Sequence, residues 1–287
     1  MTISINSNLA SVRSQRLLGQ SSDSLNRTYE KLTSGQRINR ASDDAAGLAI
    51  AESLRVNSRI ASVAIRNAQD GISAIAVADG ALASIGGVLS RLAELTQQAA
   101  NGSYSSVQRS ALQAEFATLG SEIERIAVTT TFNGVSLLSG TQQISFQIGF
   151  DGASTSQIVL DQSGGSTLQK LGLAASGSSA LTYSLTGTTT DYSQSAARAA
   201  LAAVNTAITS LNTLRGTLGT VEGRLQSAIT NLTTSRENIQ AAESRISDVD
   251  VAVEAAELTR LNILQQAGAA VLAQANQQPQ LAVSLLR

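Results

Sequence analysis

The sequence predicts a mainly α-helical protein, in which long antiparallel helical rods form a coiled-coil-like bundle with nested N- and C-terminal helices and one small β-hairpin. Three observations predict this class. The 287-residue chain has a single proline, so almost all of it is free to be helical. Hydrophobic residues make up 43% of the chain but aromatic residues only 3%, which suits narrow seams between helices better than a thick core. Residues 201–246 also carry an unbroken helical repeat.

Alternate steps of three and four residues through 201–246 give the heptad stripe of a coiled-coil seam. One of its two rows is entirely aliphatic and contains Val204, Leu211, Leu218, Leu225, Leu232, Ile239 and Ile246. The other row includes charged residues such as Arg215 and Glu243. A continuous helix here would be about 65–70 Å long, and its aliphatic row alone would not offset the entropy lost on ordering it. The rod therefore needs partner helices from the rest of the chain.

The N-terminal segment, residues 3–32, has an amphipathic helical pattern that is only weakly apolar. We expect Gly35 to end this helix and Ser42 to cap the next one. The two aspartates after Ser42 would then lie in a first helical turn, where the helix dipole favours negative charge. Such a helix would be marginal without partners.

Two more helices should follow as an antiparallel hairpin. The first is expected over about 43–100 and ends at the turn Asn101-Gly102. The second is expected over about 105–128, where strict spacing of four and three residues places Leu112, Phe116, Leu119, Ile123 and Ile126 on one face. Together with the rod, these positions predict a bundle core of Leu112, Phe116, Leu119, Val204, Leu211, Leu218, Leu225 and Leu232.

The pattern then changes from helical to alternating. Asn133-Gly134 predicts a tight turn, and the alternation through 144–148 and 158–160 predicts a β-hairpin. Residues 164–195 are rich in Gly, Ser and Thr, which indicates exposed loop and short strand. After Ile246 the heptad stripe fails, and a new phase through Leu258, Leu261, Gly268, Leu272 and Ala275 predicts a last helix. It ends with Pro279 and the apolar tail Leu281, Val283, Leu285 and Leu286.

The chain is thus expected to be nested in three parts. Residues 1–42 with 250–287 form terminal helices, residues 43–140 with 195–249 form an inner helical bundle, and residues 141–194 form the β-hairpin and a Ser/Thr/Gly-rich variable loop. The terminal stripes are thin, so an isolated pair of such helices would bury too little to offset the cost of ordering it. The apolar residues of these two ends include Leu9, Leu18, Leu25, Leu258, Leu261, Leu272 and Leu286.

Missing residue types exclude most chemistry. Without histidine or cysteine, the chain cannot build a Ser-His-Asp or Cys-His triad, a HExxH zinc site or a Cys/His metal cluster. The pairs Asp43 with Asp44 and Glu122 with Glu124 could in principle act as acid and base, but charges at a helix start or on a helix face are ordinarily just solvated. We therefore expect no enzymatic activity, no metal and no cofactor.

Net charge and hydropathy limit the classes of partner that the chain could bind. The net charge is −1 with interspersed signs, which favours neither nucleic acid nor an anionic membrane surface. No apolar run reaches the length of a membrane span, and residues 1–18 show no secretory signal. Without cysteine the chain has no disulfide. This absence would help a chain that is threaded unfolded through a narrow conduit.

Several motifs carry a resemblance to one family. They are LTSGQRIN at 32–39, SDDAAGL at 42–48, QAAN at 98–101, FNG at 132–134, AESRISDVD at 242–250 and LQQAGAAVLAQANQ at 264–277. In this order, over both ends of the chain, they resemble bacterial flagellin. About fifty residues separate Leu138 from the C-terminal rod, so the chain resembles a short form without the large outer domains of many flagellins.

The resemblance implies a function and partners. Flagellins leave the cell unfolded through the flagellar type III export apparatus without a cleaved signal peptide, and they polymerise head-to-tail into the extracellular filament that drives swimming. The terminal helices would form the inner filament core, disordered in the monomer, and the bundle would form the outer tube wall. The polymerisation residues, buried collectively between neighbouring copies, would be Leu9, Leu18, Leu25, Leu258, Leu261, Leu272 and Leu286. Partners would be the chain itself, an export chaperone and the cap protein. A hook–filament junction protein is the alternative, and a soluble helical bundle or an acid–base enzyme ranks below it.

The resemblance also implies a receptor epitope. In flagellins recognised by Toll-like receptor 5, an Arg, a Leu four residues later and a Glu on the next helix form it, and Arg91, Leu95 and Glu115 match. Ser90 departs from the family pattern. Ordinary surface and lateral-packing roles are the alternative for these three residues. Residues 29–50 similarly resemble the segment that plant receptors recognise, with differences at Arg40 and Ser42 that leave the outcome open.

Overall fold

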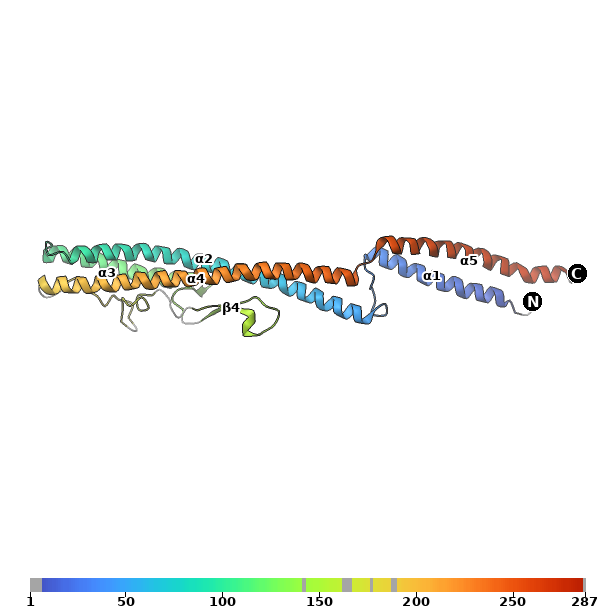
Figure 1. Cartoon of the computed structure of the whole chain (residues 1–287), viewed down its shortest axis with the longest axis horizontal. Helices are drawn as coiled ribbons and strands as arrows, with labels where there is room; N and C mark the ends of the chain where they lie inside the picture. The colour runs from blue at the N-terminus through green and yellow to red at the C-terminus, as the bar shows by residue number, and fades with distance from the viewer. Residues whose placement is uncertain (1–6, 141–142, 162–166, 176–177, 187–189, 286–287) are drawn as a thin grey trace. The chain divides into compact units, whose positions relative to one another are not determined.

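The computed structural model describes residues 7–140, 143–161, 167–175, 178–186 and 190–285. Its elements are α1 (Leu9–Ser34), α2 (Ala45–Ala99), α3 (Ser106–Thr129), β1 (Thr131–Phe132), β2 (Val135–Ser136), β3 (Ile144–Gln147), the 3₁₀ helix η1 (Ser154–Ser156), β4 (Gln157–Leu160), α4 (Thr190–Ser247) and α5 (Val251–Leu285) (Figure 1). The predicted mainly α-helical class is confirmed, and the described residues contain two small antiparallel strand pairs, β1 with β2 and β3 with β4.

The chain divides into two compact units, residues 1–58 with 237–287 and residues 59–236. Both divisions fall inside long helices, α2 and α4, and both lie farther from the chain ends than the boundaries expected from the sequence at 42 and 250. Each unit is organised around its own helix packing.

In the unit 59–236, α2, α3 and α4 lie side by side and share one core (Figure 1). Heptad-like spacing buries one face of each helix. The most deeply buried side chains include Leu82, Ile85, Leu89 and Leu92 of α2, Phe116 and Ile123 of α3, and Val204 and Leu225 of α4. By length and composition α2 is the one helix in the described ranges that is apolar enough to cross a membrane, but this core accounts for its apolar face.

Local capping fixes the hairpin of α2 and α3. Ser105 and Gln108 form a reciprocal capping box at the start of α3, which satisfies two otherwise unpaired N–H groups. Arg109 is buried, and its Nη2 donates to the carbonyl of Asn101 just after α2, 2.9 Å away. A cation near a helix C-terminus is favoured by the helix dipole.

The β-structure follows the sequence pattern. Asn133 and Gly134 both have positive φ, 50° and 78°, and connect β1 to β2, so the predicted tight turn is confirmed. Strands β3 and β4 pair antiparallel from Ile144 opposite Leu160 to Gln147 opposite Gln157, as predicted. Ile158 and Leu160 bury their side chains in the shared core.

The segment after the β-hairpin departs from expectation. The sequence predicts exposed loop here, but the structure buries four leucines of this segment in the core of α2, α3 and α4: Leu168, Leu171, Leu173 and Leu185. Side chains of α3 hold the backbone in place, because Glu124 accepts from the N–H of Leu168 at 3.0 Å and Gln113 accepts from the N–H of Leu185. We call residues 167–175 and 178–186 the strap.

In the other unit, α1 lies beside α5 (Figure 1). Asn8 caps α1 by accepting the N–H of Ser11 at 3.0 Å, and Gly35 ends the helix with φ 71°, as predicted. The predicted cap of α2 is wrong. Asp44, not Ser42, accepts the N–H of Gly47, at 2.8 Å, because α2 begins at Ala45 and Asp44 is therefore the residue in the capping position.

The last helix runs through the only proline of the chain. α5 continues past Pro279 to Leu285, within the range 250–287 expected from the sequence. Proline costs a helix its N–H and crowds the preceding turn, but it does not always end it. Over residues 251–285 the surrounding sequence is rich in good helix formers such as Ala, Leu and Gln.

Candidate functional site

The acidic pairs considered for acid–base chemistry all have structural partners. Asp43 accepts the backbone N–H groups of Asn39 and Arg40, and the hydrogen bond from Arg40 lowers the pKa of Asp43. Asp44 caps α2, Glu122 pairs with Arg125 and Glu124 holds the strap. Among the described residues no group of three acidic side chains could hold a metal ion.

In the unit 1–58 with 237–287, which we call the terminal unit, the segment after α1 pairs with the segment before α5. We call this short antiparallel contact the crossing. Gln36 and Asp248 make an antiparallel bridge. Around it, the N–H of Arg37 donates to the carbonyl of Ser247 and the N–H of Val249 donates to the carbonyl of Gly35. The segment after α1 is thus fixed to the segment before α5 by backbone hydrogen bonds, which do not depend on side-chain identity.

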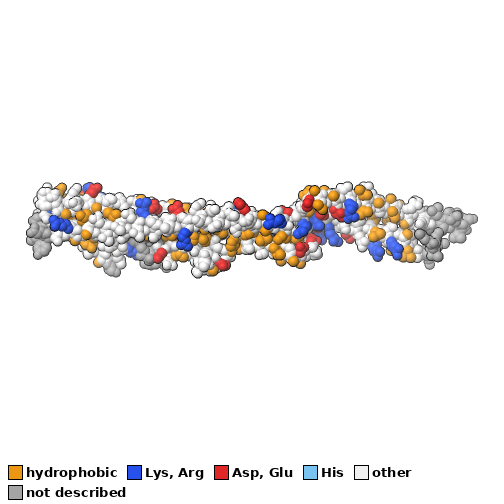
Figure 2. Space-filling view, viewed as in Figure 1, with side chains coloured by type: hydrophobic (Ala, Val, Ile, Leu, Met, Phe, Trp, Pro, Cys, Tyr) orange, Lys and Arg blue, Asp and Glu red, His pale blue; other side chains and the backbone are white. Residues whose placement is uncertain are grey.

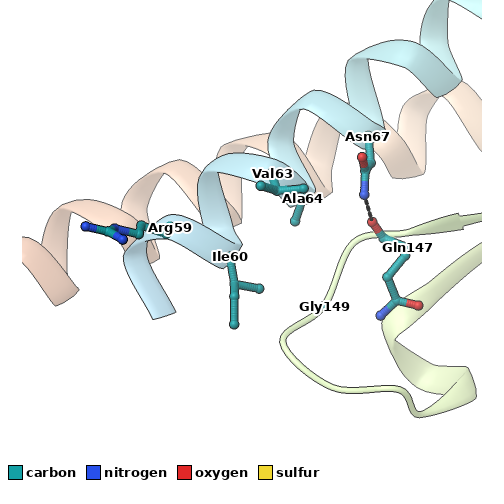
Figure 3. A pocket seen from close by; sticks show the side chains of 7 residues that line it. All are labelled: Arg59, Ile60, Val63, Ala64, Asn67, Gln147 and Gly149. Atoms are coloured by element: carbon teal, nitrogen blue, oxygen red, sulfur yellow. Dashed lines mark hydrogen bonds between the residues drawn. The ribbon is translucent and has the colours of Figure 1, made fainter. Parts of the chain in front are cut away.

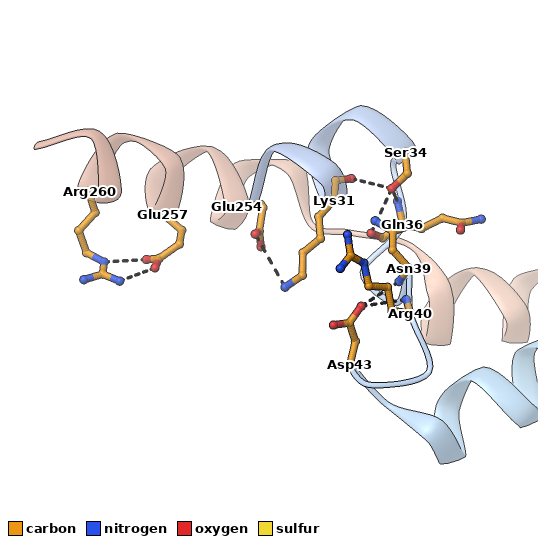
Figure 4. A network of polar contacts seen from close by, with 9 residues as sticks. All are labelled: Lys31, Ser34, Gln36, Asn39, Arg40, Asp43, Glu254, Glu257 and Arg260. Carbon is orange, nitrogen blue, oxygen red and sulfur yellow. Dashed lines mark hydrogen bonds and ion pairs between the residues drawn. The ribbon is translucent and has the colours of Figure 1, made fainter. Parts of the chain in front are cut away.

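Charged side chains beside this crossing link α1 to α5 (Figure 4). Lys31 Nζ lies 3.8 Å from Glu254 Oε1, and Arg260 Nε donates to Glu257 Oε2 at 2.7 Å. The hydrogen bond from Arg260, together with the charges of Arg260 and Lys31, lowers the pKa of Glu257. Acidic residues are favoured in this early part of α5 by the helix dipole.

The seam between α1 and α5 is narrow. Buried apolar side chains along it in the described residues are Leu25, Leu261 and Ala275. At its far end Asn8 Nδ2 donates to the carbonyl of Ala275 at 2.8 Å, and Ser11 Oγ donates to Asn276 Oδ1 at 2.7 Å. A Cβ on Gly268 would lie 3.3 Å from Leu18 Cδ1, so the helices approach closely there.

The predicted polymerisation leucines divide between seam and surface. Leu25 and Leu261 are buried in the seam, whereas Leu18, Leu258 and Leu272 are half-buried. Leu9 is 66% exposed. Leu286 lies outside the described residues. Leu25 and Leu261 therefore pack between α1 and α5 within one chain, and the role of the set in polymerisation stays a prediction.

Other apolar side chains of the same two helices face outward (Figure 2). They are 46–66% exposed and comprise Leu9, Val12 and Leu17 on α1 and Val251, Val253, Ile263, Leu264 and Val271 on α5. Apart from Leu9, sequence reasoning missed them. The available signal was that α5 is apolar on more than one face. We call these eight side chains the outer apolar face.

Two family models match the chain over most of its length. The model for the bacterial flagellin N-terminal helical region covers residues 5–143, and the model for the bacterial flagellin C-terminal helical region covers residues 201–286. The chain belongs to the bacterial flagellin family. It is therefore a structural subunit of the flagellar filament.

Curated relatives align with this flagellin from end to end. It is 43% identical to a flagellin of Halalkalibacterium halodurans over 99% of both chains and 40% identical to a flagellin of Bacillus subtilis, again over 99% of both. A flagellar filament 33 kDa core protein of Treponema phagedenis is 40% identical over 99% of both chains. These relatives favour a short-form filament subunit, and nothing in them favours the hook–filament junction alternative.

The predicted bundle core of this flagellin lies where α3 and α4 face α2. Phe116, Val204, Leu211, Leu218 and Leu225 are buried, and Leu112 and Leu119 are half-buried against the same core. Leu232 is buried in a separate cluster with Ala64 and Ile65 of α2. Charged members of the heptad stripe pair with α2. Arg215 Nε donates to Asp79 Oδ1 at 2.8 Å, and Arg55 Nε donates to Glu243 Oε1 at 2.9 Å.

The structure separates the three residues of the expected receptor epitope. Arg91 and Glu115 are exposed and joined by a hydrogen bond of 2.9 Å from Arg91 Nε to Glu115 Oε1. Hydrogen bonds from Arg91 to Glu94 and Glu115 raise the pKa of Arg91. Leu95 is fully buried in the bundle core, so the surface part of this set is the Arg91–Glu115 pair.

Proposed function

We propose that copies of this flagellin join mainly through the outer apolar face of α1 and α5, and that these helices form the inner core of the filament. One observation carries the proposal: eight large apolar side chains on two adjacent helices remain about half or more exposed in the single chain. Exposed apolar surface of this extent on a soluble subunit marks an interaction site. The bundle of α2, α3 and α4 would form the outer tube wall.

Ordering of the terminal helices is coupled to assembly in this proposal. The seam buries few large apolar side chains, while fixing each backbone residue costs about 1–2 kcal/mol before hydrogen bonds offset it. One such pair is marginal in water. We assign the paired helices to the assembled state and expect them to be largely disordered in a free subunit.

The same features fit export and the absence of enzymatic activity. A chain with no disulfide and weakly apolar ends can be threaded unfolded, so its partners would include the flagellar export chaperone and the cap protein, and no cleaved signal peptide would be needed. With no histidine or cysteine, and with its acidic pairs held in structural contacts, this flagellin would need no cofactor and catalyse no reaction.

Substitution of the outer apolar face tests the assembly surface. Leu17→Asn with Ile263→Asn should abolish filaments in negative-stain microscopy after salting out, because these side chains are 60% and 61% exposed in the single chain. Val107→Asn on α3, where Val107 is 78% exposed, is the matched control and should assemble normally. Normal filaments from the double variant would refute the proposed surface.

Hydrogen exchange tests the coupled ordering. Amides of residues 258–275 should be weakly protected in the monomer and strongly protected in the filament, because protection reports local opening. Strong protection in the monomer would contradict this part of the proposal.

Recognition by Toll-like receptor 5 is proposed for the exposed Arg91–Glu115 pair, with Leu95 supporting it from the core. Arg91→Ala with Glu115→Ala should reduce the response of receptor reporter cells to monomer. The control is Arg125→Ala with Glu122→Ala, which removes another exposed ion pair of α3. Equal responses from both double variants would argue against this epitope.

A further inference from the structure

A shallow groove of about 270 Å³ lies between α2 and the turn that follows β3 (Figure 3). Its walls are Arg59, Ile60, Val63, Ala64, Asn67, Gln147 and Gly149. Asn67 Nδ2 donates to the carbonyl of Gln147 at 3.0 Å and so ties the turn to the helix. The rest of the helix wall is apolar, with Arg59 at one end.

The rim of the groove combines apolar and basic side chains. Val63 is 44% exposed, and Phe150, next to Gly149, is also 44% exposed in a chain with only four phenylalanines. Arg59 and Arg66 are exposed, and their spacing of seven places them on one side of α2. Neither arginine has an ion-pair partner among the described residues.

Acidic residues near the groove do not neutralise the charge of Arg59 and Arg66. Asp151 accepts hydrogen bonds from the hydroxyl of Ser156 and the N–H of Ala153 within its own turn. Asp70 lies four residues after Arg66 but forms no ion pair with it. The groove therefore presents an apolar wall with a basic rim, which suits an apolar surface that carries carboxylates.

The start of α5 has the opposite character. Residues 248–257 contain Asp248, Asp250, Glu254 and Glu257 and no Lys or Arg. Lys31 and Arg260 contact two of these carboxylates, so acidic groups remain in excess. Val251 and Val253 are 62% and 64% exposed beside them, and a hollow lined by Ala252, Val253 and Ala256 opens at this surface.

We propose that the groove on α2 of one copy receives the start of α5 of a second copy. Val253 and Ala256, three residues apart on one side of α5, would cover the apolar wall around Ile60 and Val63, and the carboxylates would face the two arginines. Two different patches that complement each other on identical chains make a heterologous contact that propagates without closing, as a helical polymer requires. The inference rests on filament assembly and adds a specific pair of surfaces to it.

Charge reversal of the groove is the first test. Arg59→Glu with Arg66→Glu should raise the critical concentration for assembly of the full chain about tenfold or more, because like charges would then oppose each other. The matched control, Arg198→Glu with Arg224→Glu, makes the same charge change at two exposed arginines of α4 and should assemble like the parent. Circular dichroism of each variant checks that the helices are retained.

The complementary change on α5 makes the test specific. Ala252→Lys with Ala256→Lys adds positive charge at exposed helical positions and should also weaken assembly. Combined with Arg59→Glu and Arg66→Glu, it should restore assembly toward the parent level, and added salt should narrow all the differences. Parent-like assembly of the groove variant, or no restoration in the combined variant, would overturn the inference. Filaments of the parent under the same conditions would keep the proposed function intact.

Discussion

Charged residues within the heptad stripe of α4 show how single positions are used. Four charged residues interrupt the apolar pattern of the stripe: Arg215, Glu222, Arg236 and Glu243. Two of them pair with a residue of α2, Arg215 with Asp79 and Glu243 with Arg55. Such partly exposed pairs contribute little free energy. Their more specific effect is on register, because sliding one helix along the other by a turn would separate the charges.

The Asp79–Arg215 pair should make a small, pH-dependent contribution to stability. The hydrogen bond from Arg215 lowers the pKa of Asp79, so its contribution is present above the ordinary carboxyl pKa near 4 and is lost as the pH falls through the lowered value. Asp79→Asn should reduce the free energy of unfolding by at most about 1 kcal/mol at pH 7, because solvent screens the pair. In urea titrations this difference should shrink as the pH falls below the ordinary carboxyl pKa. A difference that stays constant with pH would exclude the ion pair as its cause.

The N-cap of α2 gives a second prediction at this scale. Asp44→Ala should destabilise the terminal unit by about 0.5–2 kcal/mol, because the N–H of Gly47 would lose its acceptor. Ser42→Ala, two residues earlier, should have no measurable effect. Thermal unfolding of the two variants distinguishes them, and equal losses would contradict the assignment of the cap.

Elements with a regular period could be predicted from the sequence, and the strap could not. The spacing of four and three residues through Phe116 located α3 to within a residue or so, because helical periodicity directly encodes a buried face. Leu168, Leu171, Leu173 and Leu185 follow neither a helical nor an alternating period. Their burial depends on side chains of α3 distant in sequence, which a local pattern does not report.

Substitutions in the strap should show that it belongs to the core. Leu168→Ala and Leu185→Ala remove fully buried side chains and should each cost about 2–5 kcal/mol, whereas Thr182→Ala, at an exposed position, should be nearly neutral. Denaturant unfolding of the monomer measures these differences. If all three variants unfold alike, the strap is an independent loop, as its composition suggested.

For the whole molecule, sequence motifs were sufficient to identify the family. They were not sufficient to predict which surfaces join one copy to another. The nested order and the terminal motifs led to the flagellins, yet two of the leucines selected for polymerisation, Leu25 and Leu261, are buried in the seam of one chain. Period alone cannot separate a seam within a chain from a contact between chains, because both need apolar residues at helical spacing. Only exposure in the folded chain distinguishes Leu25 from Leu17.

Removal of one terminal helix should separate assembly from folding. A chain lacking residues 1–35 loses α1 and its seam with α5, so it should form no filaments, while the bundle of α2, α3 and α4 keeps its core. Circular dichroism should still show a cooperative thermal transition, and sedimentation should show monomer. Filaments from this truncated chain, or loss of the cooperative transition, would contradict the division of roles between the two units.

The contact between Asn8 and Ala275 joins residues 267 positions apart, and this distance along the chain has a kinetic consequence. Closing so long a loop carries an entropic cost and makes the contact late in folding. A chain that has emerged only in part, from a ribosome or a conduit, contains α1 or α5 but never both. The seam between α1 and α5 therefore cannot form until nearly the whole chain has emerged. The late formation of the seam follows from the connectivity of the chain alone.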